Sequence, residues 1–270
     1  MSAYSLPPGR VMIQFSGGRT SAYMLHQIAE ANGGIPERAV VSFQNTGREM
    51  PETLDFVQEC GERWGIPIVW LEYQPEAPRF RVVSHNSASR DGEPFAALIR
   101  KRGFLPNRVA RFCTAELKVH CASRYAKSRG WESWHSAVGI RADEQRRLPK
   151  SPPKERWTPW HPLVAAGVTK RDVAAFWRRQ PFTLRLPNVK GNTALGNCDG
   201  CFLKSEATRA ALARGYPDRF AWWVRMEAEI ASTFRPAEPY AALADFVSRQ
   251  GDWLFNDDAY LCAADDGECT

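Results

Sequence analysis

Apolar positions in the first third of the chain form short continuous runs separated by amphipathic stretches. The runs 11–15, 39–43 and 66–73 are typical of strands that are covered on both faces. The stretches 21–31 and 51–64 between them carry helix signals, among them a proline in a first turn. Strands that alternate with helices at this spacing predict parallel pairing through right-handed crossovers. The pattern therefore predicts an α/β fold with a doubly wound, mostly parallel sheet.

The pattern weakens after the third strand. Residues 74–110 are rich in Arg, Ser, Asn and Pro and predict an irregular insertion that faces substrate. A helix over 116–129 and a strand over 134–140 follow, and the three prolines of 150–159 predict a mobile loop. A capped helix is predicted from Thr169 through Arg178.

The remaining sequence predicts two parts of unequal size. Residues 1–205 carry the α/β pattern, and residues 206–270 read as a helical extension with an acidic tail. This extension contains Trp222, Trp223 and Trp253 among alanine-rich helical stretches. We expect it to cover the sheet domain rather than to form a second catalytic domain.

The turn after the first strand has the composition of an anion site. Gly17 and Gly18 allow the backbone to turn sharply, while Ser16, Thr20 and Ser21 place hydroxyls at the start of the next helix. Unpaired N–H groups and the positive end of the helix dipole favour a phosphate there. The chain has neither a Walker A sequence nor a Gly-x-Gly-x-x-Gly after a strand, which argues against P-loop NTPases and Rossmann dehydrogenases. A plain strand-to-helix turn remains the structural alternative.

Composition and charge narrow the function classes. The chain has 270 residues, is 44% hydrophobic and carries a net charge of +6. The N-terminus has no signal sequence and no stretch is long enough to span a bilayer, so we expect a cytoplasmic protein. Residues 100–156 contain fifteen Lys and Arg against five acids, whereas 252–268 contain six acids and no base. The basic stretch fits phosphates of a nucleotide or nucleic acid, or simply solvated helix faces.

Cysteines give a second candidate site. Cys198 and Cys201 form a Cys-x-x-Cys pair, and Gly200 lets the backbone bend so that both sulfurs can share a metal or a cluster. A redox dithiol is the alternative, although such a pair normally opens a helix early in a fold. Seven cysteines in a reducing compartment favour metal or redox chemistry over disulfides.

Five short motifs follow one another along the chain. They are the Ser-Gly-Gly-x-x-Ser turn at 16–21, Asn-Thr-Gly with Pro-Glu-Thr at 45–53, Arg-Phe-Cys-Thr-Ala-Glu-Leu-Lys at 111–118, Gly-Ile-Arg at 139–141, and Trp-His-Pro-Leu at 160–163 before Asp-Val. In this order they resemble the PP-loop family that contains PAPS (phosphoadenylyl sulfate) reductases, within the adenine nucleotide alpha hydrolase-like superfamily. The resemblance spans residues 11 to 205 and implies binding of ATP or another adenine nucleotide. Many PP-loops have Asp where this chain has Thr20, which weakens the expectation of magnesium.

The resemblance also implies site residues. The nucleotide-binding set comprises Ser16, Gly17, Gly18, Arg19, Thr20, Ser21, Asn45, Thr46, Lys118, Arg146 and Arg147. The catalytic candidates are Arg141 and Cys269, the latter because a mobile tail cysteine serves sulfonucleotide reductases. Iron–sulfur reductases of the family pair two adjacent early cysteines with a late Cys-x-x-Cys. This chain has Cys113-Thr114 at the early position, so the resemblance implies three ligands of a 4Fe-4S cluster, Cys113, Cys198 and Cys201. A structural zinc completed by Cys121, Cys262 or His161 is the alternative.

Three functions follow from this resemblance. The favoured one is ATP-dependent sulfur transfer to DNA or tRNA through the cluster, with a sulfur or electron donor protein as partner. In that scheme an acceptor oxygen is adenylylated, pyrophosphate leaves, and sulfur displaces AMP. The second is reduction of adenylyl sulfate or PAPS to sulfite by a thiolate such as Cys269. The third is a nucleic-acid-binding accessory protein with a structural metal and no turnover.

Overall fold

The computed structural model describes residues 2–148, 155–189 and 192–250. It contains one six-stranded sheet and a small two-stranded hairpin. The main strands are β1 (Val11–Gln14), β2 (Ala39–Asn45), β3 (Ile68–Glu72), β4 (Arg81–Val83), β5 (Trp134–Ala137) and β6 (Trp157–Trp160), and the hairpin is β7 (Asn188–Val189) with β8 (Asn192–Thr193).

Helices connect and cover these strands. They are α1 (Arg19–Asn32), α2 (Pro51–Trp64), α3 (Glu93–Arg102), α4 (His120–Ser128), α5 (Pro162–Ala165), α6 (Lys170–Trp177), α7 (Glu206–Gly215), α8 (Pro217–Ile230) and α9 (Tyr240–Gln250). A π-helical stretch, Thr114–Val119, leads directly into α4, and a 3₁₀ stretch, Ala142–Arg147, follows β5.

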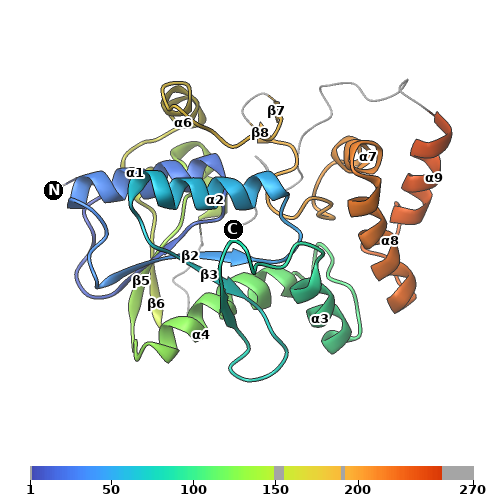
Figure 1. Ribbon diagram of the computed structural model, residues 1–270, viewed down its shortest axis with the longest axis horizontal. Helices are drawn as coiled ribbons and strands as arrows, with labels where there is room; N and C mark the ends of the chain where they lie inside the picture. The colour runs from blue at the N-terminus through green and yellow to red at the C-terminus, as the bar shows by residue number, and fades with distance from the viewer. Residues whose placement is uncertain (1, 149–154, 190–191, 251–270) are drawn as a thin grey trace.

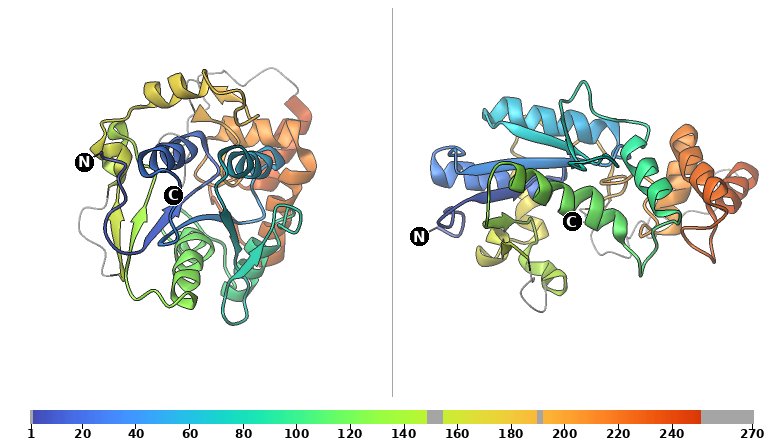
Figure 2. Two further views of the ribbon diagram at one scale, coloured as in Figure 1. Left: turned by 60° about the vertical axis from the view of Figure 1, so that its left-hand side comes forward. Right: turned by 90° about the horizontal axis from the view of Figure 1, so that it is seen from below.

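The sheet confirms the predicted α/β class. Its order is β4-β3-β2-β1-β5-β6, and every neighbouring pair is parallel except β3 with the short edge strand β4. Helices α1 and α2 lie on one face with α6, and α4 lies on the other (Figures 1 and 2). Because β2 and β5 flank β1 on opposite sides, the chain reverses direction of winding at β1. Ligands of open α/β sheets bind at such switch points, outside the carboxyl ends of the strands.

Local signals in the sequence account for most helix boundaries. Helix α2 begins at Pro51 and ends at Gly65, whose φ of 63° suits glycine. Helix α6 begins at the predicted capping box, in which the Thr169 hydroxyl donates to Asp172 Oδ2.

Two expectations about irregular segments were wrong. Residues 74–110 contain β4 and α3, and α3 forms because Phe95, Leu98 and Ile99 bury one face against the core. Within 150–159, residues 157 onward form β6, which pairs with β5, while 149–154 lie outside the described residues. The helix predicted over 116–129 starts earlier and includes the π-helical stretch.

Helices α7–α9 form the cover at the carboxyl end of the sheet (Figure 1). They share a core with α3, where the Phe95 ring lies 5.5 Å from Trp222 and 5.8 Å from Trp223 between centroids. Trp253 and the acidic tail lie outside the described residues. In the part of the chain that the structure describes, no helix combines the length and apolar character required to cross a lipid bilayer.

Candidate functional site

The loop between β1 and α1 lies at the switch point of the sheet. Gly17 has a φ of 79°, and a Cβ there would lie 2.7 Å from the Thr53 methyl carbon, so both conformation and space require glycine. Gly18 immediately precedes helix α1 and supplies no side-chain cap to its first turn. The N–H groups of that turn are thus directed toward the loop, as an anion-binding helix N-terminus requires.

Hydroxyl groups and one arginine surround this loop. Ser16 Oγ and Ser21 Oγ lie 2.9 Å apart, and Ser21 Oγ also donates to the Gly18 carbonyl. Arg141, which follows β5 and is buried, donates from Nη1 to Thr20 Oγ1 at 3.1 Å. The structure therefore brings Arg141 to the loop from 121 residues away in sequence.

The carboxylates around Arg141 fix its position. Asp143 accepts from Arg141 Nε at 3.0 Å, and buried Glu144 lies 3.5 Å from Nη1. Arg147 donates to Glu144 in turn, whereas Arg146 is exposed. Of the three arginines predicted here, Arg141 lies at the loop and Arg147 braces Glu144 behind it.

Arg19 lies at the start of α1 but its guanidinium is directed elsewhere. It donates to Thr183 Oγ1, to Thr193 Oγ1 and to the Leu186 carbonyl, at 2.9 to 3.3 Å. These contacts fasten the segment that contains the β7–β8 hairpin to the N-terminus of α1. The side chain thus has a structural use that the sequence did not indicate.

Asn45 and Thr46 lie at the carboxyl end of β2. The Asn45 amide donates to Glu72 and to the Ser89 carbonyl and accepts from the Gly47 N–H, so its side chain is engaged within the protein. The Thr46 hydroxyl donates to Glu49 and lies 3.4 Å from Cys198 Sγ. Thr46 therefore faces the cysteine site as well as the end of the strand.

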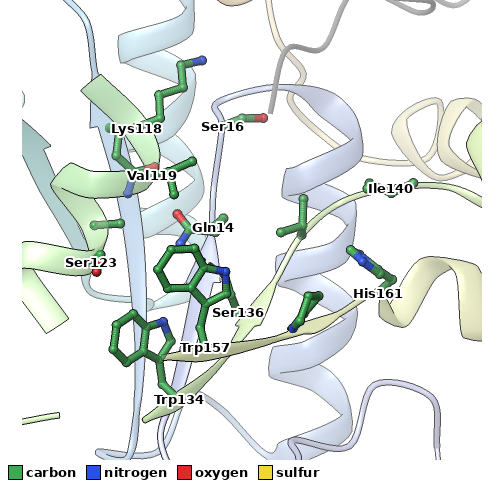
Figure 3. Close-up of a pocket in the computed structure, with 14 residues that line it drawn as sticks. Gln14, Ser16, Lys118, Val119, Ser123, Trp134, Ser136, Ile140, Trp157 and His161 are labelled. Atoms are coloured by element: carbon green, nitrogen blue, oxygen red, sulfur yellow. Dashed lines mark hydrogen bonds between the residues drawn. The ribbon is translucent and has the colours of Figure 1, made fainter. Parts of the chain in front are cut away.

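A cavity of about 380 Å³ extends from the loop along the sheet face that α4 covers. Figure 3 shows Ser16 and Lys118 at one end and Trp134 and Trp157 at the other. Its lining is mostly apolar, as in nucleotide pockets, and its size suits a nucleoside.

Polar side chains cross the floor of this cavity on three adjacent strands. Gln44 Nε2 donates to Ser42 Oγ at 2.8 Å, Ser42 to Gln14 at 3.4 Å, and Gln14 to Ser136 at 3.4 Å. On one side, neither ring nitrogen of His161 has a well-formed hydrogen bond to a described residue, and burial lowers the pKa of its imidazole against the opposing effect of the Val138 backbone. Buried polar groups with unused bonding capacity in a cavity are suited to bind a polar ligand.

Cys113, Cys198 and Cys201 line one small cavity of about 30 Å³, although 85 residues separate the first two in sequence. Cys113 precedes the π-helical stretch, and Cys198 lies opposite Glu49 in an isolated antiparallel bridge. The Cys201 N–H donates to the Cys198 carbonyl at 3.3 Å. The sequence could not establish that these three residues line one cavity, and the fold shows that they do.

Burial of these cysteines opposes ionisation of their thiols when no metal is bound. Burial, together with the nearby Glu49 carboxylate and against the opposing effects of Lys118 and Thr46, raises the pKa of Cys198 to about 12. Burial also raises the pKa of Cys113, against Thr114, Lys118 and Arg111. All three cysteines are partly exposed, although protein atoms surround the Cys198 thiol closely. A metal would thus displace protons from them.

Lys118 lines both cavities. It lies in the π-helical stretch, where the extra residue per turn changes the direction of side chains, as such stretches often do at functional sites. Its Nζ lies 3.5 Å from Asn197 Oδ1, next to the Cys-x-x-Cys loop. The large cavity and the cysteine cavity therefore share one wall.

Sequence comparison places this geometry in a family. The model of the phosphoadenosine phosphosulfate reductase domain matches residues 10–181. The chain belongs to this family. It is thereby a member of the adenine nucleotide alpha hydrolase-like superfamily, as the resemblance implied.

Individual relatives add little about activity. Over 203 residues the chain is 33% identical to the uncharacterized nin region protein ORF290 of Escherichia phage lambda. The match covers 72% of this chain and 66% of that protein, so the chain spans just under two thirds of the length of this relative. It is also similar to the PAPS reductase of Candida auris in a phosphate complex (17% identity, TM-score 0.42, 66% of this chain and 79% of that one). A third similarity is to the U34-tRNA thiolase NcsA of Methanococcus maripaludis with its [4Fe-4S] cluster (15% identity, TM-score 0.43, 82% and 72%).

The structure shows how this family member holds its Cys-x-x-Cys loop. Asp199, between the cysteines, is fully buried and its Oδ2 lies 2.6 Å from both Arg48 Nη2 and Arg219 Nε. Its Oδ1 accepts from Trp223 Nε1 and from the Gly200 N–H. Arg48 follows β2, whereas Arg219 and Trp223 belong to α8. One carboxylate thus joins the cysteine loop to the sheet and to the C-terminal helices.

Sequence reasoning missed this anchor and the polar residues of the cavity floor. A charged residue between two cysteines, and Gln14 and Ser42 inside otherwise apolar strands, were the available signals. No local signal pointed to Arg219, because its partner is 20 residues away.

Among the described residues, no further cysteine or histidine lines the cysteine cavity. Cys121 packs with Leu71 and Phe80, where burial raises its pKa to about 12, and Cys60 lies on helix α2 in the main core. His161 lines the large cavity and not the cysteine cavity. Cys262 and Cys269 lie outside the described residues. Within the described ranges, no three His, Cys, Asp or Glu side chains stand close enough to bind a single metal ion.

Proposed function

We propose that this chain is a PP-loop enzyme that uses ATP to transfer sulfur to a nucleic acid, with a 4Fe-4S cluster held by Cys113, Cys198 and Cys201. One observation carries the proposal: the three thiols share a cavity whose wall, at Lys118, is also a wall of the larger cavity beside the loop. Membership in an adenine-nucleotide-binding family supports ATP as the ligand of that larger cavity.

The cysteine cavity fits a cluster in its chemistry. It presents three thiols and no carboxylate, and two cations, Lys118 and Arg111, line it and favour thiolates. The cavity of about 30 Å³ is smaller than a four-iron cluster, so binding of a cluster requires the three thiols to move apart. When bound through three cysteines, such a cluster supplies one iron that is open to a sulfur ligand.

The protein groups at the loop would act on the nucleotide. The N-terminus of α1, with Ser16, Ser21 and Arg141, would hold the phosphates and stabilise charge on departing pyrophosphate. An acceptor oxygen attacks the α-phosphorus, the bond to the β-phosphate oxygen breaks, and pyrophosphate leaves. A sulfur nucleophile then displaces AMP from the acceptor carbon. Arg141 donates to Thr20, so a fixed cation lies where many PP-loops have a metal-binding Asp.

The family name favours reduction of a sulfonucleotide as a second candidate. That reaction requires a thiolate that attacks sulfur, for which Cys269 is the predicted residue. Sulfite release from adenylyl sulfate or PAPS that is lost in Cys269→Ser would establish reduction and contradict sulfur transfer.

Anaerobic purification followed by metal analysis and ATP–pyrophosphate exchange tests the proposal. We expect about four iron and four sulfide per chain, lost in Cys113→Ser, Cys198→Ser and Cys201→Ser. Cys121→Ala removes a buried thiol elsewhere and should retain the iron. Zinc without exchange would instead select the accessory protein with a structural metal.

A further inference from the structure

The segment between α3 and the π-helical stretch presents apolar side chains to solvent. Phe104 is 44% exposed and Val109 is 96% exposed, and Val119 just beyond is 38% exposed. These are three of the five exposed large hydrophobic side chains among residues 2–148, 155–189 and 192–250. Val119 lines the large cavity, whereas Phe104 and Val109 lie together in residues 103–112 and gain little from burial in the fold, so these two mark a contact surface.

The local structure holds these side chains in place. Asn107 Oδ1 accepts from the N–H groups of Val109 and Ala110 at 2.9 and 2.8 Å, which forms a tight turn with Arg108 and Val109 at its tip. Buried Leu105 anchors the turn to the core. The exposed tip is therefore a built feature of the fold.

An aromatic pair lies at the base of this turn. The rings of Phe104 and Phe112 are 4.9 Å apart between centroids with an interplanar angle of 68°. The Arg102 guanidinium lies 5.5 Å from the Phe112 centroid and pairs with Glu116 at 2.9 Å. The pair is thus braced on one side while Phe104 keeps an open face.

The charge of the segment has one sign. Residues 94–115 contain five Lys and Arg and no acid. Arg100 and Arg102 pair with Glu229 and Glu116, but Arg108 and Arg111 are exposed and have no carboxylate partner in the described part of the chain. Arg111 also lines the cysteine cavity. Two cations without a carboxylate partner in the described part of the chain therefore lie between the exposed turn and the thiols, Arg108 in the turn and Arg111 at the cysteine cavity.

We propose that residues 103–112 are a docking platform for single-stranded nucleic acid, with a base stacked on Phe104 and phosphates at Arg108 and Arg111. Aromatic faces beside cations are what single strands bind, because every base has a π-face and every linkage a negative charge. A strand on this platform reaches the cysteine cavity through Arg111. The assignment deepens the proposed function by locating its acceptor, and its test does not depend on turnover.

Fluorescence anisotropy with labelled 12-nucleotide RNA and DNA of one sequence tests the platform on the full chain. Phe104→Ala should weaken binding about 5- to 100-fold, the range for loss of one stacked base. Phe104→Leu keeps the apolar contact without the aromatic face and should show a loss of the same kind. Arg108→Glu should weaken binding and lower the slope of log K against log salt by about one. Comparison of the two strands shows whether RNA or DNA is preferred.

Arg171→Glu is the matched charge reversal, on α6 at the opposite face of the sheet. It should change affinity less than twofold. Equal binding by wild type, Phe104→Ala and Arg108→Glu, or no binding of either strand at low salt, would overturn the platform. Binding of anionic lipid vesicles that is lost in the same variants would also overturn it, in favour of a membrane. Oligonucleotide binding without pyrophosphate exchange would instead defeat only the proposed enzyme activity.

Discussion

Replacement of Asp199 by Asn is the sharpest test of how the cysteine loop is held. The carboxylate is fully buried, and the substitution removes its charge with almost no change in volume. Arg48, which is 2% exposed, and Arg219, 16% exposed, would then lie without their counter-charge. The amide oxygen can still accept some of the four hydrogen bonds, so the loss is mainly electrostatic.

The expected magnitude follows from the burial of this network. Removal of one partner from a buried ion pair costs about 3–5 kcal/mol, because the remaining charge is left unpaired. For a chain of this size each kcal/mol lowers Tm by about 2–4 °C, so Asp199→Asn should lower Tm by about 6–20 °C. Under the proposed function, the iron content of the cluster should fall together with stability, since the same carboxylate positions the backbone between Cys198 and Cys201.

Differential scanning calorimetry and iron analysis at one pH measure both effects. Asp245→Asn is the matched control, because Asp245 forms an exposed ion pair with Arg249 on α9, of the kind that contributes about 0.3–0.5 kcal/mol. If Asp199→Asn lowered Tm no more than Asp245→Asn and retained its iron, the anchoring argument would be refuted.

Further predictions concern the loop, the shared wall and pH. Gly17→Ala should lower the free energy of unfolding by about 1–3 kcal/mol and weaken ATP binding in calorimetric titration, whereas Gly33→Ala, also at positive φ but in open space, should leave binding intact. Lys118→Met should lower both the affinity for ATP and the iron content of the proposed cluster, because Lys118 lines both cavities. The control Lys127→Met, on the exposed side of α4, should lower neither. Burial lowers the pKa of His26, so below about pH 6.5 the unfolded chain binds more protons than the folded protein. Tm should therefore fall as the pH is lowered through this range, and it should fall less steeply in His26→Phe. An identical dependence of Tm on pH in both proteins would contradict this.

Local patterns were enough to predict the sheet core and its helices. Each of these signals depends only on residues close to it in the sequence. They are the buried runs that form β1, β2 and β3 and the helix starts at Pro51 and Thr169. Helix α3 was missed although Phe95, Leu98 and Ile99 stand at helical spacing, because the polar, Arg- and Ser-rich residues 84–92 before it hide so short an apolar run. Strand β6 was missed because its pairing with β5, not its own sequence, makes it a strand.

The sequence by itself determined the family, the α/β sheet and the residues of the loop, because these depend on short motifs and on the spacing of apolar positions. Only the tertiary structure decided that Cys113 lines one cavity with Cys198 and Cys201, that Arg141 lies at Thr20, and that Arg19 and Asn45 are engaged by the protein itself. Such contacts join segments far apart in the chain. Their partners are set by the winding of the sheet around β1 and by the burial of Asp199 against α8, which no local pattern encodes.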